Sequence, residues 1–145
     1  MAELHRAVAA LRIVGDELLP QDVTAALGCE PSKKFARGEV LDHPTRPSRT
    51  ARFGLWSLEA VETEPADLDA QIMELLGRVT ADPGVWADLG QTFAVSLFCG
   101  WFMESWNEGV FVSPVTLAAL GARGIALDID LLSWVKPFSA LGPGS

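Results

Sequence analysis

The sequence has few of the residues from which most enzyme sites are built. It contains no tyrosine, two histidines and two cysteines. His5 lies near the N-terminus and His43 in a proline-rich segment, and no pattern places either beside a serine or cysteine that it would activate. The glycine-rich sequences GxGxxG and GxxxxGK, which bind nucleotides, are absent. We therefore expect no catalytic residue, no cofactor and no enzymatic activity.

The few cysteines and histidines also argue against a metal site or a disulfide framework. Cys29 and Cys99 stand seventy residues apart and form no CxxC or Cys/His motif. This spacing is typical of two reduced, mostly buried thiols, with a disulfide or a redox role as the alternatives. Asp42 and His43 are adjacent but have no second ligand cluster, so the sequence predicts no metal.

Long apolar runs and an excess of basic residues are lacking as well. No run reaches the roughly eighteen apolar residues that a membrane span needs, and Arg12 and Asp16 interrupt the apolar N-terminus, which no cleavage site follows. The formal net charge is -8, and such a field repels nucleic acids and anionic membranes. We expect a cytoplasmic protein that binds neither.

The bulk composition is that of a globular domain. The chain has 145 residues, of which 49% are hydrophobic and 21% charged. A domain of this size buries roughly 68–70% of its unfolded surface, so it needs no metal or disulfide to hold a core. We expect residues 1–145 to form a single domain, with a Pro/Arg-rich loop at about 30–51 and a loose tail from about 137.

The N-terminal half alternates strands and helices. Residues 8–14 read as a strand with Leu11 and Ile13 on one face, and a short helix follows from Pro20 to a stop at Gly28. The loop after it is expected to hold at most a short edge strand around Val40 and Leu41.

Residues 52–61 are apolar on both faces, as in an interior strand. Phe53 and Leu55 point one way, and Trp56 and Leu58 the other.

The clearest helix lies in EPADLDAQIMELLGRV, where apolar residues recur at helical spacing on one stripe: Leu68, Ile72, Leu75, Leu76 and Val79. ADPG ends this helix, and VWADL after it is expected to add one more turn. Residues 92–103 form a near-continuous apolar run that we interpret as the central strand.

The C-terminal part begins with the turn ESWNEG and a short strand at VFV. Ser113 and Pro114 make a good N-cap and first turn for a helix that ends near Gly124. The last strand, IALDIDLL, alternates. Its inward residues are Ile125, Leu127, Ile129 and Leu131, and Asp128 and Asp130 point outward.

This order of elements favours an α+β fold. We expect a mainly antiparallel sheet of four to five strands with two to three helices on one face. A doubly wound parallel sheet is the alternative. The simplest interpretation of Asp128 and Asp130 is that they lie on the solvent-exposed face of a strand. The alternative interpretation is a functional pair of carboxylates.

One segment concentrates the basic residues of the chain. Residues 33–52 hold six of the eleven Lys and Arg side chains and carry a charge of +4, which leaves -12 elsewhere. In the simplest interpretation this segment rests on the acidic body of its own domain through weak surface pairs. In the functional one its side chains bind a carboxylate, a phosphate or an acidic patch. The six are Lys33, Lys34, Arg37, Arg46, Arg49 and Arg52.

Tryptophans are the second candidate feature. Trp56, Trp101 and Trp106 fall on or beside the two strands expected in the middle of the sheet, and tryptophan is frequent at binding hot spots. The simpler interpretation is that these tryptophans pack in the hydrophobic core. If helices cover one face only, the outward-facing Trp56 and Leu58 need another cover. A second copy of the chain, a ligand or the basic segment would supply it.

Three stretches stand in a distinctive order and spacing between Leu11 and Leu132. They are LRIVGDELLPQDVTAALGCEP, then GLWSLE with DLDAQIMELL, and FVSPVTLAALGARGIALDIDL. Together they resemble one bacterial family, the domain-of-unknown-function family four-two-seven-nine. KKFARGE corresponds to the family's basic segment between the first two blocks, and a Pro/Arg-rich piece follows it here. The resemblance implies a small cytoplasmic bacterial α+β domain and supplies no catalytic residue.

Two functions remain as hypotheses. The first is a non-catalytic module that binds a protein, of immunity type by analogy with other acidic bacterial domains, through its acidic surface or a tryptophan-bearing sheet face. The second is a sensor or carrier in which the basic segment closes over an anionic small molecule held against tryptophan.

Overall fold

A five-stranded sheet forms the centre of the protein. The computed structural model describes residues 2–3, 6–63, 66–103 and 108–133. Neighbouring strands pair antiparallel except the last two, which are parallel, so the predicted α+β class with a mainly antiparallel sheet is confirmed. In spatial order the strands are β3 (Lys33–Phe35), β6 (Gly54–Glu59), β2 (Arg6–Gly15), β7 (Ala94–Met103) and β9 (Ala126–Ser133).

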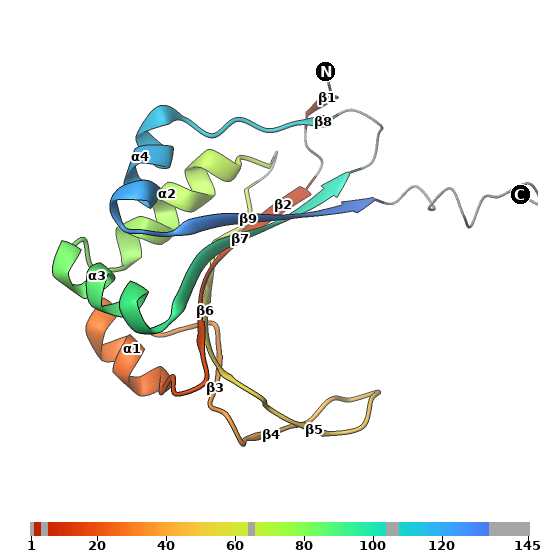
Figure 1. Ribbon diagram of the computed structural model, residues 1–145. Helices are drawn as coiled ribbons and strands as arrows, with labels where there is room; N and C mark the ends of the chain where they lie inside the picture. The colour runs from red at the N-terminus through yellow and green to blue at the C-terminus, as the bar shows by residue number, and fades with distance from the viewer. Residues whose placement is uncertain (1, 4–5, 64–65, 104–107, 134–145) are drawn as a thin grey trace, which may run out of the picture.

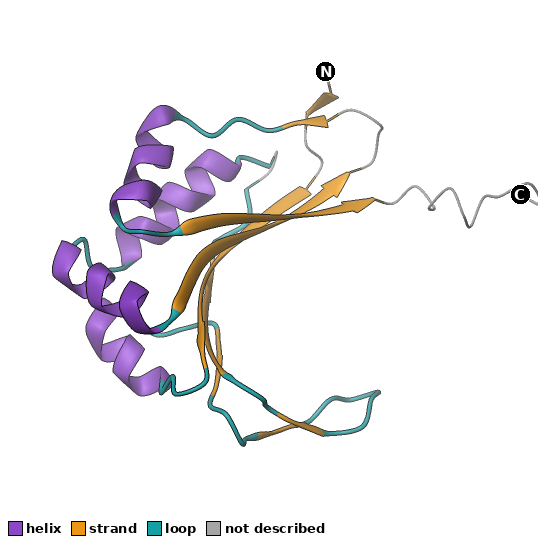
Figure 2. Ribbon diagram, viewed as in Figure 1, coloured by secondary structure: helices purple, strands orange, loops and turns teal. Residues whose placement is uncertain are grey.

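The helices lie together on one side of this sheet, as Figures 1 and 2 show. They are α1 (Pro20–Leu27), α2 (Leu68–Arg78), α3 (Pro83–Thr92) and α4 (Pro114–Ala122). The described residues thus contain one helix more than the largest number predicted. The addition is α3, which runs for ten residues where the sequence suggested a single turn.

The helix ends follow simple rules of capping. Asp82 accepts a hydrogen bond from the Gly84 backbone N–H at 2.9 Å and Pro83 fills the first turn, which explains why α3 forms. The predicted N-cap Ser113 is confirmed, because its Oγ accepts from the Thr116 N–H at 3.2 Å. Gly28 ends α1 with a φ of 76°, a conformation that glycine adopts without strain.

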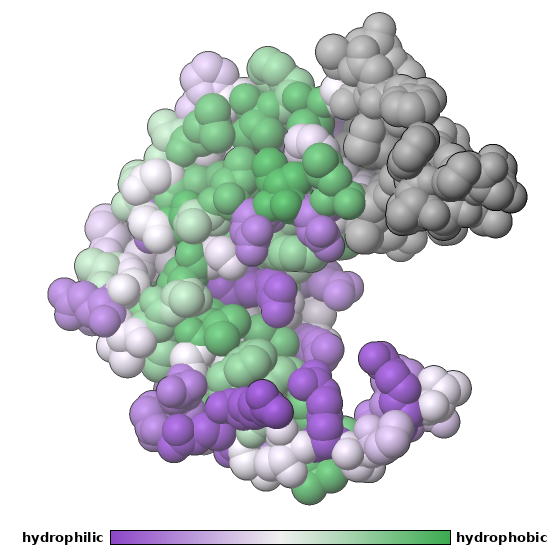
Figure 3. All heavy atoms as spheres, turned by 45° about the vertical axis from the view of Figure 1, so that its right-hand side comes forward, coloured by the Kyte–Doolittle hydropathy of each residue, from purple (hydrophilic) through white to green (hydrophobic). Residues whose placement is uncertain are grey.

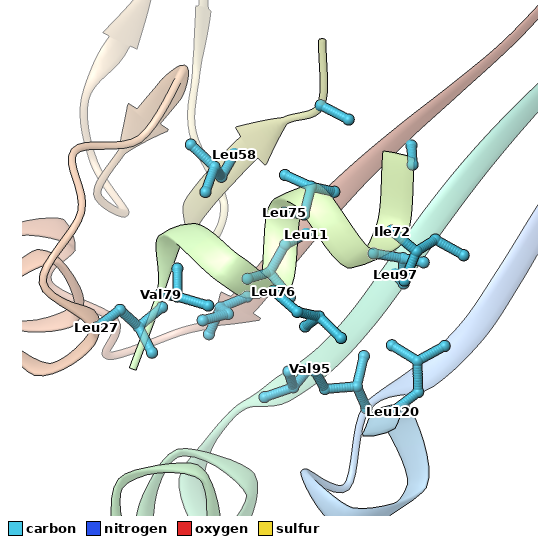
Figure 4. Packing of buried hydrophobic residues seen from close by; sticks show 14 of the residues in the cluster. Leu11, Leu27, Leu58, Ile72, Leu75, Leu76, Val79, Val95, Leu97 and Leu120 are labelled. Atoms are coloured by element: carbon cyan, nitrogen blue, oxygen red, sulfur yellow. The ribbon is translucent and has the colours of Figure 1, made fainter. Parts of the chain in front are cut away.

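The main core lies between the helices and the sheet. Figure 4 shows side chains of α2 pointing onto the strands, among them Leu75 and Ile72 toward Leu11 and Leu97. All four are completely buried. The predicted stripe of α2 is therefore the stripe that packs on the sheet.

One polar side chain of α2 completes the sheet. Gln71 is 1% exposed, and its Oε1 accepts from the Ala9 N–H at 3.0 Å while its Nε2 donates to the Ala7 carbonyl at 2.8 Å. The last backbone hydrogen bond between this end of β6 and β2 runs from the Ala60 N–H to the Ala9 carbonyl at 2.8 Å, so the Ala9 N–H and the Ala7 carbonyl would otherwise be buried without a partner. The side-chain amide of Gln71 takes the place of a strand there.

A second polar contact joins α2 to α4. Asp69 Oδ1 accepts from the Ser113 N–H at 2.7 Å. This backbone hydrogen bond is the main reason that the pKa of the Asp69 carboxyl lies below its ordinary value, and burial acts in the opposite direction.

Two strand assignments from the sequence are wrong. The central strand is β2, which pairs with β6 on one side and β7 on the other, whereas β7 lies next to the edge strand β9. VFV is not a strand. The short strand there is β8 (Glu108–Gly109), which pairs with β1 (Ala2–Glu3). The predicted loose tail lies outside the described residues.

The basic segment contributes β3 to the sheet, and its remainder, residues 36–52, forms an arm at one end of the sheet. β4 (Val40–Leu41), where an edge strand was expected, pairs with β5 (Arg49–Thr50), and the arm bends toward the sheet face without helices (Figure 1). A small apolar cluster anchors the arm to that face. Its members are Phe35, Ala51 and Leu55, with Val14, Leu41 and Phe53 packed against them.

No helix in the described part of the chain is both long enough and apolar enough to cross a membrane.

Candidate functional site

The sheet face opposite the helices is the most distinctive surface of the protein. We call it the open face. Figure 3 shows that it is hollowed between the sheet and the arm. Strand register places four polar side chains in one row across it, because Lys33 lies opposite Ser57, Ser57 opposite Arg12, and Arg12 opposite Ser96. Side chains opposite each other in neighbouring strands have Cβ atoms about 5 Å apart. The row therefore forms a continuous polar strip.

Arg12 stands at the centre of this strip. Its side chain is half-buried, and its guanidinium carbon lies 5.2 Å from the centre of the Phe98 ring. With the described residues it makes neither an ion pair nor a hydrogen bond, and the hydroxyls of Ser57 and Ser96 make no hydrogen bond with them either. The strip thus places a half-buried cation between the hydroxyl groups of the buried Ser57 and the half-buried Ser96.

Lys33 and Lys34 are neighbours in the sequence but lie on opposite sides of the sheet. Lys33 pairs with Ser57 on the open face, and its Nζ is 6.0 Å from the centre of the Phe35 ring. Lys34 pairs with Trp56, whose side chain points to the helices. Both lysines are exposed. They form a matched pair for experiments on the open face.

Among the arginines of the basic segment, Arg37 behaves as a surface ion pair. Its guanidinium lies 2.7 Å from Glu17 Oε1, and the two side chains are 51% and 77% exposed. Such an exposed pair contributes little to stability. Within the described residues it is the one contact of the six basic side chains with an acid, so the expected neutralisation of the segment is seen at this position alone.

Arg49 lies on the inner side of the arm. It pairs with Leu41, and opposite residues of an antiparallel pair share a side. Leu41 packs on the apolar cluster of the open face, so Arg49 is on the same side. Arg46 instead contacts Nε2 of His43 at 2.9 Å, and Arg52 is exposed.

The predicted outward orientation of Trp56 and Leu58 is wrong. Trp56 is wholly buried under the helices, and its Nε1 donates to Thr24 Oγ1 of α1 at 3.0 Å. Leu58 is buried on the same side, so neither residue needs an outside cover. Trp101, which pairs with Ala7, also lies on the helix side and is half-buried. Trp106 is outside the described residues. The aromatic side chain at the centre of the open face is Phe98.

The residues of the polar strip other than Lys33 were not found from the sequence. Arg12 in the apolar run AALRIVG was a signal, because a cation at an alternate position of a strand must face away from the core. Ser57 and Ser96 gave none, since nothing in the sequence places them beside Arg12.

Asp128 and Asp130 are exposed on β9 at the far side of the open face, and the predicted outward orientation is confirmed. Within the described ranges, no three His, Cys, Asp or Glu side chains lie close enough together to hold a metal ion.

The two cysteines are free thiols in different surroundings. Cys29 is half-buried and Cys99 is completely buried. Burial raises the pKa of the Cys99 thiol to about 12, and the Asp128 carboxylate acts in the same direction. Because the thiolate is the reactive form, Cys99 is expected to be inert. At pH 8 a disulfide reagent should modify Cys29 in the folded protein and both thiols in urea. Equal modification rates of Cys29 and Cys99 in the folded protein would contradict the burial of Cys99.

The raised pKa also gives a pH dependence with a defined sign. The folded protein favours the neutral thiol, so this contribution to stability is complete below the ordinary thiol pKa of 9.0 and is lost as the pH rises toward the raised pKa of about 12. In urea titrations between pH 8 and pH 11, the wild type should lose more stability than Cys99→Ala. Parallel curves for the two proteins would contradict the expectation.

Comparison with known proteins identifies a family. The family model described as "Domain of unknown function (DUF4279)" matches residues 3–134. No curated protein and no solved structure matches the chain.

Proposed function

The chain belongs to the DUF4279 family, as its three sequence blocks predicted, and we propose that it is a non-catalytic protein-binding module of the bacterial cytoplasm. In this proposal the open face receives an extended, acidic segment of a partner protein. An immunity-type role, in which the module occupies a toxin and blocks it, is one form that such binding would take.

The observation that carries the proposal is the gathering of cations around the hollow. Arg12 and Lys33 lie in its polar strip and Arg49 on the inner side of the arm, and none has an acidic partner among the described residues. The chain as a whole has a charge of -8. Such cations are available for carboxylates, and Arg12 between two hydroxyls suits the two oxygens of one carboxylate.

The shape of the open face favours a protein segment over a small molecule. Five strands at about 4.8 Å spacing make a surface roughly 19 Å wide, which matches several residues of an extended chain. Small-molecule sites bury about 70–90% of their ligand, and a broad hollow covers much less of a metabolite. The anion carrier with a closing arm is therefore the second candidate, with Phe98 in place of tryptophan against the ligand.

The matched lysines test the proposal. A fluorescein-labelled peptide of eight residues with alternating glutamate and serine should bind the wild type in an anisotropy titration. Lys33→Glu should weaken binding about tenfold or more, since a hydrogen bond to a charged group contributes about 1.5–3 kcal/mol. Lys34→Glu carries the same change of net charge and should weaken binding much less. Arg12→Gln should act like Lys33→Glu.

Three results would contradict the proposal. Equal losses for Lys33→Glu and Lys34→Glu would mean that only long-range attraction holds the peptide. A dimer that the acidic peptide dissociates would assign the open face to a second copy of the chain. An anionic metabolite that raises stability by roughly 2.7 kcal/mol at 100 times its dissociation constant, while the peptide does not bind, would favour the carrier.

A further inference from the structure

The free edge of β9 is a second candidate binding surface. In the described part of the sheet β9 pairs with β7 alone, so its other edge presents a row of unpaired backbone N–H and C=O groups. The opposite edge is β3, which has only three residues, two of them lysines, and is therefore protected. β9 has eight residues and no lysine or proline.

The side chains of β9 divide into an apolar row and an acidic row. Leu127, Ile129 and Leu131 lie on the helix side and are 37%, 41% and 59% exposed. Asp128 and Asp130 lie on the open face, exposed and without an ion pair to any described residue. Figure 3 shows apolar surface gathered in the upper part of the view, where Figure 1 places α4 and β9.

The acidic row disfavours a second copy of the chain as the occupant of this edge. An antiparallel pair centred on Ile129 places Asp128 of one copy opposite Asp130 of the other. A shift of two residues either way places Asp128 opposite Asp128 or Asp130 opposite Asp130. Like charges directly opposite each other destabilise a strand pair. The net charge of -8 opposes self-association further.

We propose that the β9 edge binds an extended segment of a partner protein in which basic and apolar residues alternate. The segment adds a strand to the sheet through backbone hydrogen bonds. Its apolar side chains cover Leu127, Ile129 and Leu131, and its basic side chains lie opposite Asp128 and Asp130. This site is separate from the polar strip of the proposed function and has the opposite charge preference.

A labelled peptide of eight residues with alternating valine and lysine tests the site. Binding should slow backbone hydrogen exchange in residues 126–131. A peptide with four valines followed by four lysines has the same charge but cannot match both rows, and it should bind about tenfold more weakly. The double variant Asp128→Asn, Asp130→Asn should weaken the alternating peptide by a similar factor. The control Asp22→Asn, Asp88→Asn removes the same charge from exposed positions on helices and should have little effect.

The outcomes separate the alternatives. Equal affinity for the two peptides, or no added exchange protection in residues 126–131, would overturn the proposal. A wild-type dimer in sedimentation velocity that protects residues 126–131 would overturn it in favour of self-pairing. A monomeric wild type whose variant Asp128→Thr, Asp130→Thr self-associates would support it, because only the two carboxylates would then prevent self-pairing.

Discussion

Replacing Gln71 by leucine is expected to lower the free energy of unfolding by about 3 kcal/mol. Leucine fits the apolar stripe of α2 but leaves the Ala9 N–H and the Ala7 carbonyl without partners, and each buried unsatisfied group costs about 1–3 kcal/mol. For a chain of this length the melting temperature should fall by about 10 °C. Urea unfolding followed by tryptophan fluorescence measures the change.

A charged analogue makes this test specific. In Gln71→Glu the ionised carboxylate cannot donate to the Ala7 carbonyl, but the protonated acid can. The folded protein then favours the protonated form and raises the pKa of the new side chain. The loss of free energy of unfolding in Gln71→Glu, measured against the wild type, should therefore become smaller as the pH falls from 7 to 5.

The exposed substitution Gln91→Leu in α3 is the control and should change stability by less than about 0.5 kcal/mol. A Gln71→Leu variant as stable as this control would contradict the role of the amide.

Replacing Trp56 by alanine is expected to cost about 3–5 kcal/mol, the usual range for removing a buried tryptophan. The side chain is completely buried between β6 and the helices, and its loss leaves a cavity beside α1. Denaturant unfolding measures the loss. Phe111→Ala removes an aromatic side chain that is 71% exposed and should change stability by less than about 0.5 kcal/mol.

A milder change separates the structural role of Trp56 from a binding role. Trp56→Phe keeps most of the apolar volume and loses the hydrogen bond to Thr24, so it should remain folded with a loss of about 1–2 kcal/mol. Because the ring lies behind the sheet, the affinity of the open face for the acidic peptide should not change. If Trp56→Phe lost affinity for the acidic peptide while its stability stayed unchanged, Trp56 would have a role in binding.

Local patterns were enough to predict most of the elements. The helical stripe of α2 and the Ser113 cap depend on neighbours within a few residues, and the structure confirms both. The alternation of β9 is confirmed for the outward Asp128 and Asp130. The prediction that Leu127, Ile129 and Leu131 point into the core is wrong, because β9 is an edge strand and these side chains are 37%, 41% and 59% exposed. The extent of α3 was underestimated because its apolar contacts are few. Trp86 and Leu89 are its buried residues, and the Asp82 cap with Pro83 was the stronger signal.

The faces of the strands could not be predicted with the same success. The alternation in GLWSLE separates Leu55 from Trp56 but does not say which of them meets the helices. That depends on pairing with β2, where Trp56 lies opposite Ile13, a residue more than forty positions away. The polar strip around Arg12 depends on the same long-range register. Its residues come from four strands, so no spacing along the chain reveals it.

The position of β2 has a consequence for synthesis on the ribosome. It precedes the other four strands of the sheet in the sequence, yet it lies in their centre, and Val14 pairs with Ala94, 80 residues later. At about 5–20 residues per second, one side of β2 waits roughly 4–16 s for its neighbour. During that interval a nascent chain carries an apolar strand with an open edge, so chaperones that hold such segments should associate with it before β7 is made.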